Sequence, residues 1–259
     1  MMFYEGAEKR LEICTATINL LDFPHDFWET FVKQAGAYIL SAMQHQSSKA
    51  FLLSESSLFI WPNKLLLITC GDTHILNSAL FFLQQVTLKE ITSLIFQRHQ
   101  TLRPEKQKSQ FMDDCAILNK QLAGEIKMLQ KNYSGLLYQH GTVPLSNATQ
   151  QILMLHQLKS DFAQQLQKGG VPVQWINNQL ALKHFFPQFN IDAFSFKPRG
   201  YSVNAIANDH YFTLHITPEK LSTYLSFESN LESSLLTDFF TFLGALFKPK
   251  KNCLLQLSR

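Results

Sequence analysis

The sequence predicts an α+β fold, because runs of strand character follow one another along the chain and each group of strands ends in a helix. This pattern occurs twice, once in each half of the chain, as a strand meander followed by a helical run. The third observation is composition, since 259 residues with 46% hydrophobic content and only ten glycines can bury a substantial core. We therefore expect a single domain, residues 1–259, of two similar halves, although no residue-level repeat is visible.

The first half is predicted to begin with a helix over residues 24–36, where Pro24 suits a first turn and Gly36 suits the C-terminal cap. Four strand-length runs follow in two pairs, one joined by the polar HQSS and the other by the turn-forming residues 62–63. A helix with apolar spacing is expected at residues 74–86. The strands are expected at residues 37–44, 49–56, 57–61 and 64–70.

The second half is predicted to hold another meander that ends in a helix. Three alternating runs within residues 190–219 are separated by the turn-forming sequences PRG and ND, and a fourth strand is expected at residues 222–229. The closing helix is expected over residues 233–247. Between the two meanders, residues 109–122 have helical character and residues 133–143 have the pattern of a strand with its turn.

Charge and hydropathy argue against several classes of protein. The formal charge of +3 comes from 23 basic and 20 acidic residues, and the one dense basic cluster, KPKK at residues 248–251, is too small for a nucleic-acid reader. No apolar run approaches the roughly 20 residues that span a bilayer, and the N-terminus is charged where a signal peptide is apolar. We therefore expect a cytoplasmic protein that binds neither nucleic acid nor a membrane.

The cysteines predict neither a disulfide framework nor a metal site. Cys14, Cys70, Cys115 and Cys253 lie far apart in the sequence and show no C-x-x-C spacing. We expect all four to be free thiols and expect no metal ion.

The run FLLSESSLFI, residues 51–60, places an acid and three hydroxyls between two hydrophobic strands. One interpretation is a polar turn, since such residues mark turns. The other is chemical, because a serine hydroxyl beside a strained peptide can attack the preceding carbonyl, so that the chain cuts itself and leaves a modified N-terminus. Residues 54–57 alone leave both interpretations open.

Four separated motifs resemble those of the eukaryotic-type S-adenosylmethionine decarboxylases, in the same order and with similar spacing. They are FYEGAEKRLE at residues 3–12, LLSESSLFI with ITCG at residues 52–71, FKPRGYSVN at residues 196–204, and YFTLHITPE with YLSFE at residues 211–228. The resemblance implies the fold of that family, a four-layer αββα sandwich with two antiparallel sheets flanked by helices. It also implies an enzyme that makes its own pyruvoyl cofactor.

In this family the serine after the glutamate attacks the glutamate carbonyl, an ester replaces the amide, and elimination leaves a pyruvoyl group. The resemblance places the cut between Glu55 and Ser56. The products would be a β chain of residues 1–55 and an α chain of residues 56–259, which stay associated because their strands share sheets. The pyruvoyl carbonyl can form a Schiff base with the amine of S-adenosylmethionine and act as an electron sink.

Three further residues match processing or catalytic positions of the family. A histidine in FTLHITPE is ordinarily a satisfied core residue, but His215 and Ser202 match positions that support self-cleavage, where a neutral imidazole can serve as a base. Cys70 would ordinarily be a small buried hydrophobe. In the TCG motif, however, the resemblance makes it the acid that reprotonates the substrate carbanion.

Tyr4, Phe196 and Glu219 match positions that bind the substrate, although by default the rings would be core residues and the acid would be solvated. The resemblance implies that the two rings stack on both faces of adenine and that the carboxylate accepts hydrogen bonds from the ribose hydroxyls. Tyr4 departs from the usual phenylalanine but keeps the ring face. Leu53 and Glu55 would hold the base through backbone contacts.

Two acids near the N-terminus also match the family. Glu5 and Glu8 have the spacing of acids in the first turn of a helix, but they coincide with the acids of FEGxEK, which lie close to the reaction centre. An acidic wall there would favour the sulfonium cation of the substrate. Arg199 replaces a smaller residue of FxPxGYS, with an effect that the sequence does not reveal.

Putrescine activation is not expected. Activated relatives hold the diamine in a buried acidic cluster, and a lysine two residues before the catalytic cysteine relays the effect. Here Ile68 occupies the lysine position. If QQILMLHQL at residues 150–158 aligns with LEILMSEL of the family, Gln151 and Asn147 replace two acids, which leaves Glu12 and Glu228. Because a buried charge is tolerated only when paired, two acids make a poor diamine site. The alternative is that another charged residue has moved in from elsewhere.

The animal enzymes extend several dozen residues beyond the position of Arg259, so we expect an outer strand or two of the family fold to be missing. A sheet edge exposed in this way would need protection. Pairing with a second copy in a homodimer is one way to provide it.

Three functions remain, each of a different class. The first is a self-processed S-adenosylmethionine decarboxylase that produces the aminopropyl donor for spermidine and spermine. The second is a pyruvoyl decarboxylase with a switched substrate, ornithine or arginine, which would have no reason to keep the adenosine-binding residues. The third is a non-catalytic regulatory paralogue, a class that tends to lose the processing serine. Retention of Ser56, Cys70, Ser202, His215 and Glu219 favours the first.

Overall fold

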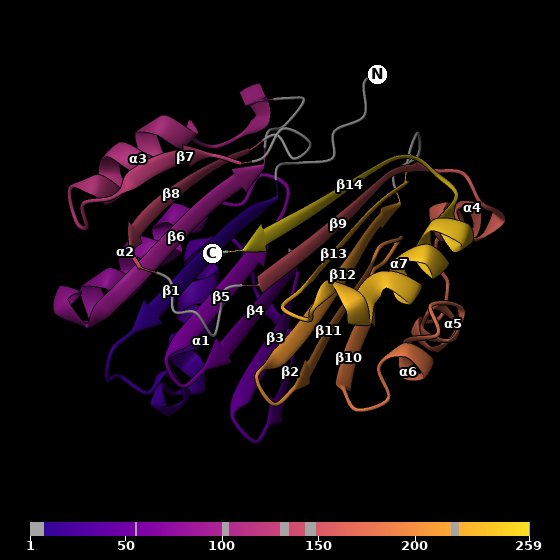
Figure 1. Ribbon diagram of the computed structural model, residues 1–259, viewed down its shortest axis with the longest axis horizontal. Coiled ribbons are helices and arrows are strands. Elements are labelled where there is room, and N and C mark those ends of the chain that lie inside the picture. Colours follow the sequence, from indigo (N-terminus) through magenta and orange to yellow (C-terminus); the bar gives the residue numbers. More distant parts are fainter. Residues whose placement is uncertain are drawn as a thin grey trace. The chain divides into compact units, whose positions relative to one another are not determined.

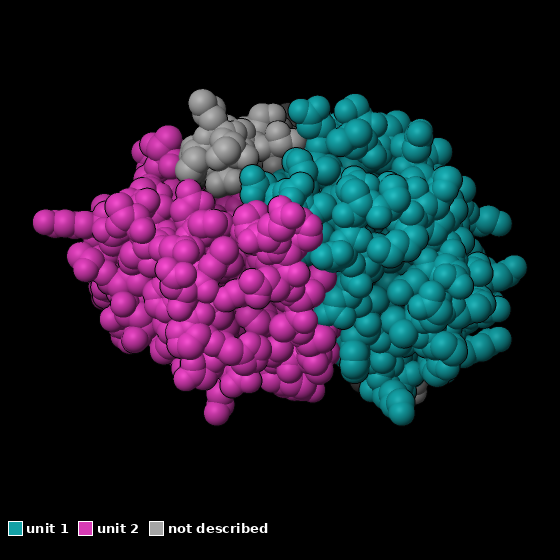
Figure 2. Space-filling model, turned by 90° about the horizontal axis from the view of Figure 1, so that it is seen from below, with its two compact units in different colours: residues 1–3, 145–259 teal, residues 4–144 magenta. Residues whose placement is uncertain are grey.

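The computed structural model describes most of the chain, in two compact units that Figure 2 colours separately. Unit 2 is Tyr4–Pro144, and unit 1 is Met1–Phe3 with Leu145–Arg259. Each unit contains one antiparallel sheet with helices, which confirms the α+β class and the two antiparallel sheets flanked by helices. The described residues are 8–54, 56–99, 104–129, 135–142, 149–218 and 223–258.

The sheet of unit 2 has eight strands in the order β2-β3-β4-β5-β1-β6-β8-β7. The strands are β1 (Lys9–Thr15), β2 (Ile39–His45), β3 (Ser48–Leu53), β4 (Ser56–Trp61), β5 (Lys64–Thr69), β6 (Ile91–His99), β7 (Glu125–Met128) and β8 (Gly135–Gly141). The helices are α1 (His25–Gln34), α2 (Ile75–Gln85) and α3 (Phe111–Asn119), with short 3₁₀ turns η1 (Leu20–Asp22), η2 (Leu88–Glu90) and η3 (Pro104–Lys106). The meander β2 to β5 is therefore confirmed.

Alternate residues of these strands face the helices, as the period of a β-strand requires. Leu11 and Ile13 of β1 lie in one buried cluster with Trp28 of α1 and Phe82 of α2. Burying side chains of this size removes most of their apolar surface from water, which is worth about 1.5–3 kcal/mol for each. Gly36 has a φ of +88° and follows α1, as expected for a glycine that ends a helix.

The sheet of unit 1 has six strands in the order β10-β11-β12-β13-β9-β14, and β14 lies at one edge. The strands are β9 (Thr149–Leu158), β10 (Asn190–Ser195), β11 (Tyr201–Ala207), β12 (His210–Pro218), β13 (Thr223–Ser229) and β14 (Pro249–Ser258). The helices are α4 (Asp161–Lys168), α5 (Val173–Gln179), α6 (Leu182–Phe185) and α7 (Ser233–Phe247). They lie on one face of this sheet (Figure 1), over a cluster that includes Val203, Leu214 and Phe227.

The two sheets share a topology. In unit 2 the meander is β2-β3-β4-β5. The strand that precedes it in the sequence, β1, lies between β5 and the next strand along the chain, β6. In unit 1 the order β10-β11-β12-β13-β9-β14 repeats this arrangement strand for strand. The strands β8 and β7 extend the first sheet alone. The similarity of the halves therefore lies in the connection of the strands.

Several elements were not anticipated from the sequence, namely the strands β1, β6, β7, β9 and β14 and the helices α4, α5 and α6. The reason is clearest in β1, where Lys9, Arg10 and Glu12 are all buried and hide the apolar alternation of a strand. In the described part of the chain, no helix combines the length and apolar character needed to cross a membrane. The four cysteines are free thiols, as expected.

Candidate active site

Ser56 begins β4 at the end of the sheet where β3 stops. Leu53, the last residue of β3, pairs with Ser56, so β3 and β4 are antiparallel neighbours. Ser54 lies in a turn, in line with the turn interpretation. Ser56 also has a φ of 136°, in a region that side-chain-bearing residues rarely adopt and that costs about 1–3 kcal/mol. A buried serine hydroxyl thus lies next to a strained backbone, as the chemical interpretation requires.

The sheet gathers the described candidates of unit 2 at one end of four strands. Ser56 pairs with Thr69, and Thr69 pairs with Lys9, so Ser56 begins β4 beside the end of β5 and the start of β1. Cys70 follows Thr69 directly, and Glu8 precedes Lys9 directly. Because neighbouring strands lie about 4.8 Å apart, these ends are close together. Glu8 leads into a strand, so the interpretation of it as a helical first-turn acid is wrong.

Side chains from three segments hold the turn that carries Cys70. The Thr73 hydroxyl donates to the carbonyl oxygen of Cys70 at 3.1 Å. Lys9 Nζ and Gln107 Nε2 both donate to the carbonyl oxygen of Gly71, at 2.6 and 3.2 Å. Gly71 has a φ of +70°, which favours glycine at this position. The backbone that presents the partly exposed Cys70 is therefore fixed on several sides.

Lys9 is a buried cation that sequence reasoning did not single out, although it lies within the quoted motif FYEGAEKRLE. Only 1% of the side chain is exposed, and burial lowers the pKa of Lys9 to about 8, with the positive charge of Arg98 acting in the same direction. Arg98 is the residue paired with Lys9 on β6, and its guanidinium forms an ion pair with Asp114 of α3. Its place in that motif was the one signal available in the sequence.

In unit 1, Ser202 of β11 and His215 of β12 are directly paired residues of neighbouring strands. Ser202 Oγ and His215 Nδ1 lie 2.7 Å apart, within hydrogen-bond distance. Both side chains project from the face opposite the helices, since Val203 and Leu214 belong to the core under those helices. Burial lowers the pKa of His215 to about 4, so that the ring is neutral near physiological pH.

Two neighbours of this pair, Thr213 and Asn204, lie within the quoted motifs but were not singled out from the sequence. Thr213 precedes His215 by two residues on β12 and therefore projects from the same face. Its Oγ1 lies 2.7 Å from His215 Nε2 and donates toward Asn204 Oδ1 at 3.1 Å. Thr213 and Asn204 are paired residues, as are Thr213 and Glu228. These contacts depend on strand register, which no short stretch of sequence reveals.

Phe196 lies in the turn between β10 and β11. Its N–H donates to the carbonyl oxygen of Gly200 at 2.9 Å, and its ring packs edge-on against Phe194 with the ring centres 5.0 Å apart. Gly200 has a φ of +123°, and a side chain there would crowd the Phe196 ring. Arg199 Nη1 donates to the carbonyl oxygen of Gln167 at 3.0 Å. Arg199 therefore ties this turn to the end of α4.

Four of the predicted site residues lie outside the described residues, and the proposals for them stand on sequence alone. They are Tyr4, Glu5, Glu55 and Glu219. Within the described ranges, no group of three or more His, Cys, Asp or Glu side chains could hold a metal ion.

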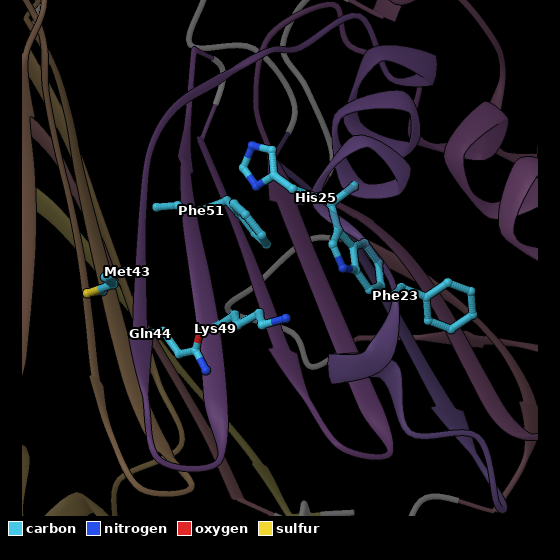
Figure 3. Close-up of a pocket in the computed structure, with 8 residues that line it drawn as sticks. Phe23, His25, Met43, Gln44, Lys49 and Phe51 are labelled. Carbon is cyan, nitrogen blue, oxygen red and sulfur yellow. The ribbon is translucent and has the colours of Figure 1, made fainter.

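A pocket of about 350 Å³ lies in unit 2, between the start of α1 and the hairpin of β2 and β3 (Figure 3). Its lining residues are Phe23, His25, Trp28, Ala42, Met43, Gln44, Lys49 and Phe51. None of the predicted site residues is among them. The pocket is therefore separate from the strand ends that carry Ser56 and Cys70.

Comparison with known proteins supports the resemblance seen in the four sequence motifs. A family model described as adenosylmethionine decarboxylase matches residues 1–258. The S-adenosylmethionine decarboxylase proenzyme of Dictyostelium discoideum is 27% identical over 275 residues, covering 95% of this chain and 72% of that protein. The proenzyme of Onchocerca volvulus is 29% identical over 276 residues, covering 96% of this chain and 74% of that protein.

A solved structure shows the same fold. The AdoMetDC-delta26 monomer of Trypanosoma brucei aligns with a TM-score of 0.60 and 18% identity, over 75% of this chain and 77% of that chain.

Proposed function

Because this chain belongs to the adenosylmethionine decarboxylase family, we propose that it decarboxylates S-adenosyl-L-methionine with a pyruvoyl group made from its own Ser56. The product is the aminopropyl donor for spermidine and spermine biosynthesis. The observation that carries the assignment to Ser56 is its φ of 136° at the start of a buried strand. A strained conformation beside a hydroxyl lowers the barrier to rearrangement, since part of the strain is released when the amide is replaced.

In the proposed cleavage, the peptide bond between Glu55 and Ser56 is first converted to an ester, which is then eliminated. Ser56 Oγ attacks the carbonyl carbon of Glu55, the bond from that carbon to the Ser56 nitrogen breaks, and an ester forms. Removal of the Ser56 Cα proton then expels the Glu55 carboxylate from Cβ, and water releases the nitrogen as ammonia. The sum consumes one water and leaves chains 1–55 and 56–259. Ser202 and His215 support these proton transfers, because a neutral imidazole hydrogen-bonded to a hydroxyl can accept a proton.

The two chains remain together after this cut, because the strands of residues 1–55 are interleaved with those that follow. β3 pairs with β4, and β1 lies between β5 and β6 with pairs on both sides. Many backbone hydrogen bonds therefore hold β1 and β3 in the sheet without the peptide bond at residue 55. Extraction of β1 would leave buried donors and acceptors unpaired on the two neighbouring strands, β5 and β6.

In the decarboxylation itself, the pyruvoyl group supplies a carbonyl that withdraws electrons from the substrate α-carbon. Cys70 then acts as the acid that returns a proton to that carbon. The turn that carries Cys70 is held by Lys9 and Thr73, so that the thiol is presented on fixed backbone. Such positioning matters, because proton transfer requires hydrogen-bond distance between the acid and the reacting atom.

Other residues bind the substrate in this proposal. Tyr4 and Phe196 stack on adenine, Glu219 accepts hydrogen bonds from the ribose, and the backbone of residues 53 and 55 holds the base. The Phe196 turn is supported by the bonds within it, since the N–H of Phe196 reaches the carbonyl oxygen of Gly200. Glu5 and Glu8 supply the negative charge that favours a sulfonium cation.

An assay with carboxyl-labelled S-adenosylmethionine tests this function. Purified wild-type protein is expected to release labelled CO₂ from this substrate, and not from carboxyl-labelled ornithine or arginine. Release from ornithine or arginine alone would favour a switched substrate. A protein that releases label from none of the three and remains uncut would fit the regulatory class.

The structure supplies a buried cation near the position where activated relatives use a lysine. Ile68 pairs with Arg10 across β5 and β1, and Arg10 Nη2 lies 2.7 Å from Glu12 Oε2 in an ion pair that is almost fully buried. Since the two residues are two apart on one strand, they project from the same face. A cation of the chain itself is therefore already paired with Glu12, which supports the expectation that putrescine does not bind there.

We expect putrescine at millimolar concentration to change neither the rate of self-cleavage nor that of decarboxylation. A diamine would have to displace Arg10 from Glu12, and breaking a buried ion pair costs about 3–5 kcal/mol. Both rates should be measured with and without the diamine. A several-fold stimulation that Glu228→Gln abolishes would contradict this expectation, because it would show that an acidic diamine site persists.

The pH dependence of self-cleavage should reflect the low pKa of His215. Its pKa of about 4 keeps the ring unprotonated, so the base stays available as the pH falls through 6.5, the ordinary value for histidine. We expect a level cleavage rate between about pH 8 and pH 6 and a fall only nearer pH 4. Precursor from cell-free synthesis, followed by denaturing electrophoresis in a series of buffers, provides the measurement. A cleavage rate that falls to half its maximum near pH 6.5 would contradict this expectation.

A further inference from the structure

His215 has a hydrogen-bond partner at each ring nitrogen. Ser202 Oγ lies 2.7 Å from Nδ1, and Thr213 Oγ1 lies 2.7 Å from Nε2. A neutral imidazole carries one N–H, so one nitrogen donates and the other accepts. Only the nitrogen without hydrogen can take a proton from Ser202. The neighbours of the ring therefore decide which nitrogen of His215 carries no hydrogen.

Thr213 favours one tautomer of His215. Its hydroxyl has a single hydrogen, and besides His215 it has two partners that can only accept a hydrogen bond. Its Oγ1 donates toward the carbonyl oxygen of Val203 and toward Asn204 Oδ1, both at 3.1 Å. With the hydrogen directed there, the lone pairs of Thr213 Oγ1 face His215 Nε2. Nε2 must then carry the ring hydrogen, and Nδ1 presents a lone pair to the hydroxyl of Ser202.

We propose that Thr213 is a positioning residue that holds His215 as the Nε2-protonated tautomer, which leaves Nδ1 as the base toward Ser202. The proposal rests on the proposed function, since it assumes that His215 takes part in self-cleavage. Its geometry comes from the sheet. Ser202 pairs with His215 and Asn204 pairs with Thr213, and these two pairs are separated by the pair of Val203 and Leu214, so all four side chains project from one face of the sheet.

A hydroxyl beside Nε2 fixes the tautomer of His215 without the increase in pKa that a carboxylate would cause. A carboxylate at Nε2 would orient the ring but would also stabilise its protonated form and raise its pKa. Thr213 is neutral, so it sets the tautomer while burial keeps His215 uncharged. Glu228, which pairs with Thr213 on the next strand, accepts a hydrogen bond from Tyr211 Oη at 2.6 Å.

The test combines two variants with one matched control. Thr213→Val removes the hydroxyl with little change in volume, and Thr213→Ser restores it. Thr217→Val makes the same substitution two residues beyond His215 on the same strand, where the structure gives the side chain no part in this network. Cleavage is timed with precursor from cell-free synthesis. The tautomer is read from ¹⁵N resonances of histidine in the uncut Ser56→Ala chain, with His215→Gln to assign the signals.

The parent protein should show a protonated Nε2 and a bare Nδ1 at His215. Thr213→Val should lose this single tautomer and cleave about 5- to 150-fold more slowly, the range expected when one buried hydrogen-bond partner is removed. Thr213→Ser and Thr217→Val should keep the parent spectrum and rate to within a few-fold. A protonated Nδ1 in the parent, or an unchanged tautomer in Thr213→Val, would overturn the proposal.

Different results would contradict the proposed self-cleavage and the proposed role of Thr213. A wild-type chain that is never cleaved would contradict the proposed function, while the ¹⁵N spectrum would still decide the tautomer. A Thr213→Val chain that folds, loses the tautomer and yet cleaves at the wild-type rate would overturn the role assigned to Thr213 in positioning the base. Near-ultraviolet circular dichroism identifies a variant that has lost its packing, and the Thr213→Ser chain then carries the comparison.

Discussion

Ser56→Ala should give a single uncut chain with no decarboxylase activity. The substitution removes the one oxygen that can attack the Glu55 carbonyl and from which the pyruvoyl group is made, so no cofactor forms and catalysis is lost altogether. Denaturing electrophoresis of the purified variant should show one band of full length. The assay with labelled S-adenosylmethionine should show no release of CO₂ above the protein-free background.

Ser57→Ala is the matched control, because Ser57 carries the same hydroxyl one residue later and is also buried, with none of its surface exposed. This variant should still be cleaved into two chains. If Ser56→Ala were cut at the same bond as wild type, or were active while uncut, the assignment of the nucleophile to Ser56 would be wrong.

Cys70→Ala should separate the making of the cofactor from its use. The variant should still be cleaved, because Cys70 lies after β5 and contributes no atom to the ester or to the new terminus. Decarboxylation should slow by about 10²- to 10⁴-fold, the usual contribution of a positioned acid, or should place the returning proton on the wrong atom. Single-turnover rates and mass analysis of the product distinguish these two effects.

Cys253→Ala provides the comparison, since Cys253 is a partly exposed free thiol like Cys70 but lies on β14 in the other unit. Its cleavage and its turnover should both resemble those of wild type. Equal losses in the two cysteine variants would show that the effect comes from thiol removal in general, and would contradict a specific role for Cys70.

The parts of the fold that could be predicted from the sequence are the ones governed by local patterns. The meanders β2 to β5 and β10 to β13 consist of strand-length runs rich in apolar residues between recognisable turns, and α1, α2 and α7 have the apolar spacing of helices. The order of strands in the sheets could not be predicted. β1 pairs with β5 and β6, and β9 pairs with β13 and β14, through contacts between residues far apart in the chain.

The missed strand β1 shows why functional segments escape a search for apolar patterns. Lys9, Arg10 and Glu12 are buried because each has a specific partner or role within the sheet, for example the contact of Lys9 with Gly71 and that of Arg10 with Glu12. Buried charges are rare in strands, so a pattern-based prediction treats them as evidence for a loop or a helix end. Local rules fail at sites where a protein retains polar groups for function.

In the candidate site, too, local motifs identified some residues, while others depend on how the strands pair. The motifs named Ser56, Cys70, Ser202 and His215, and the structure brings Ser202 within 2.7 Å of His215 as directly paired residues. The supporting residues were not predicted, because Thr213 meets His215 through strand periodicity and meets Asn204 through register. Register is a property of two strands together, so a single stretch of sequence does not encode it in a readable form.

The intact mass of the purified wild-type chain, measured under denaturing conditions, tests the central claim most directly. Self-cleavage at Ser56 predicts two species, residues 1–55 and a pyruvoyl-capped chain 56–259, whose masses sum to the full-length mass plus one water and minus one ammonia. The longer chain should also resist N-terminal sequencing, because a keto group has replaced its amine. Active protein with a single full-length mass would contradict the account, as would two chains that sum to the full length plus one water, since that is simple hydrolysis.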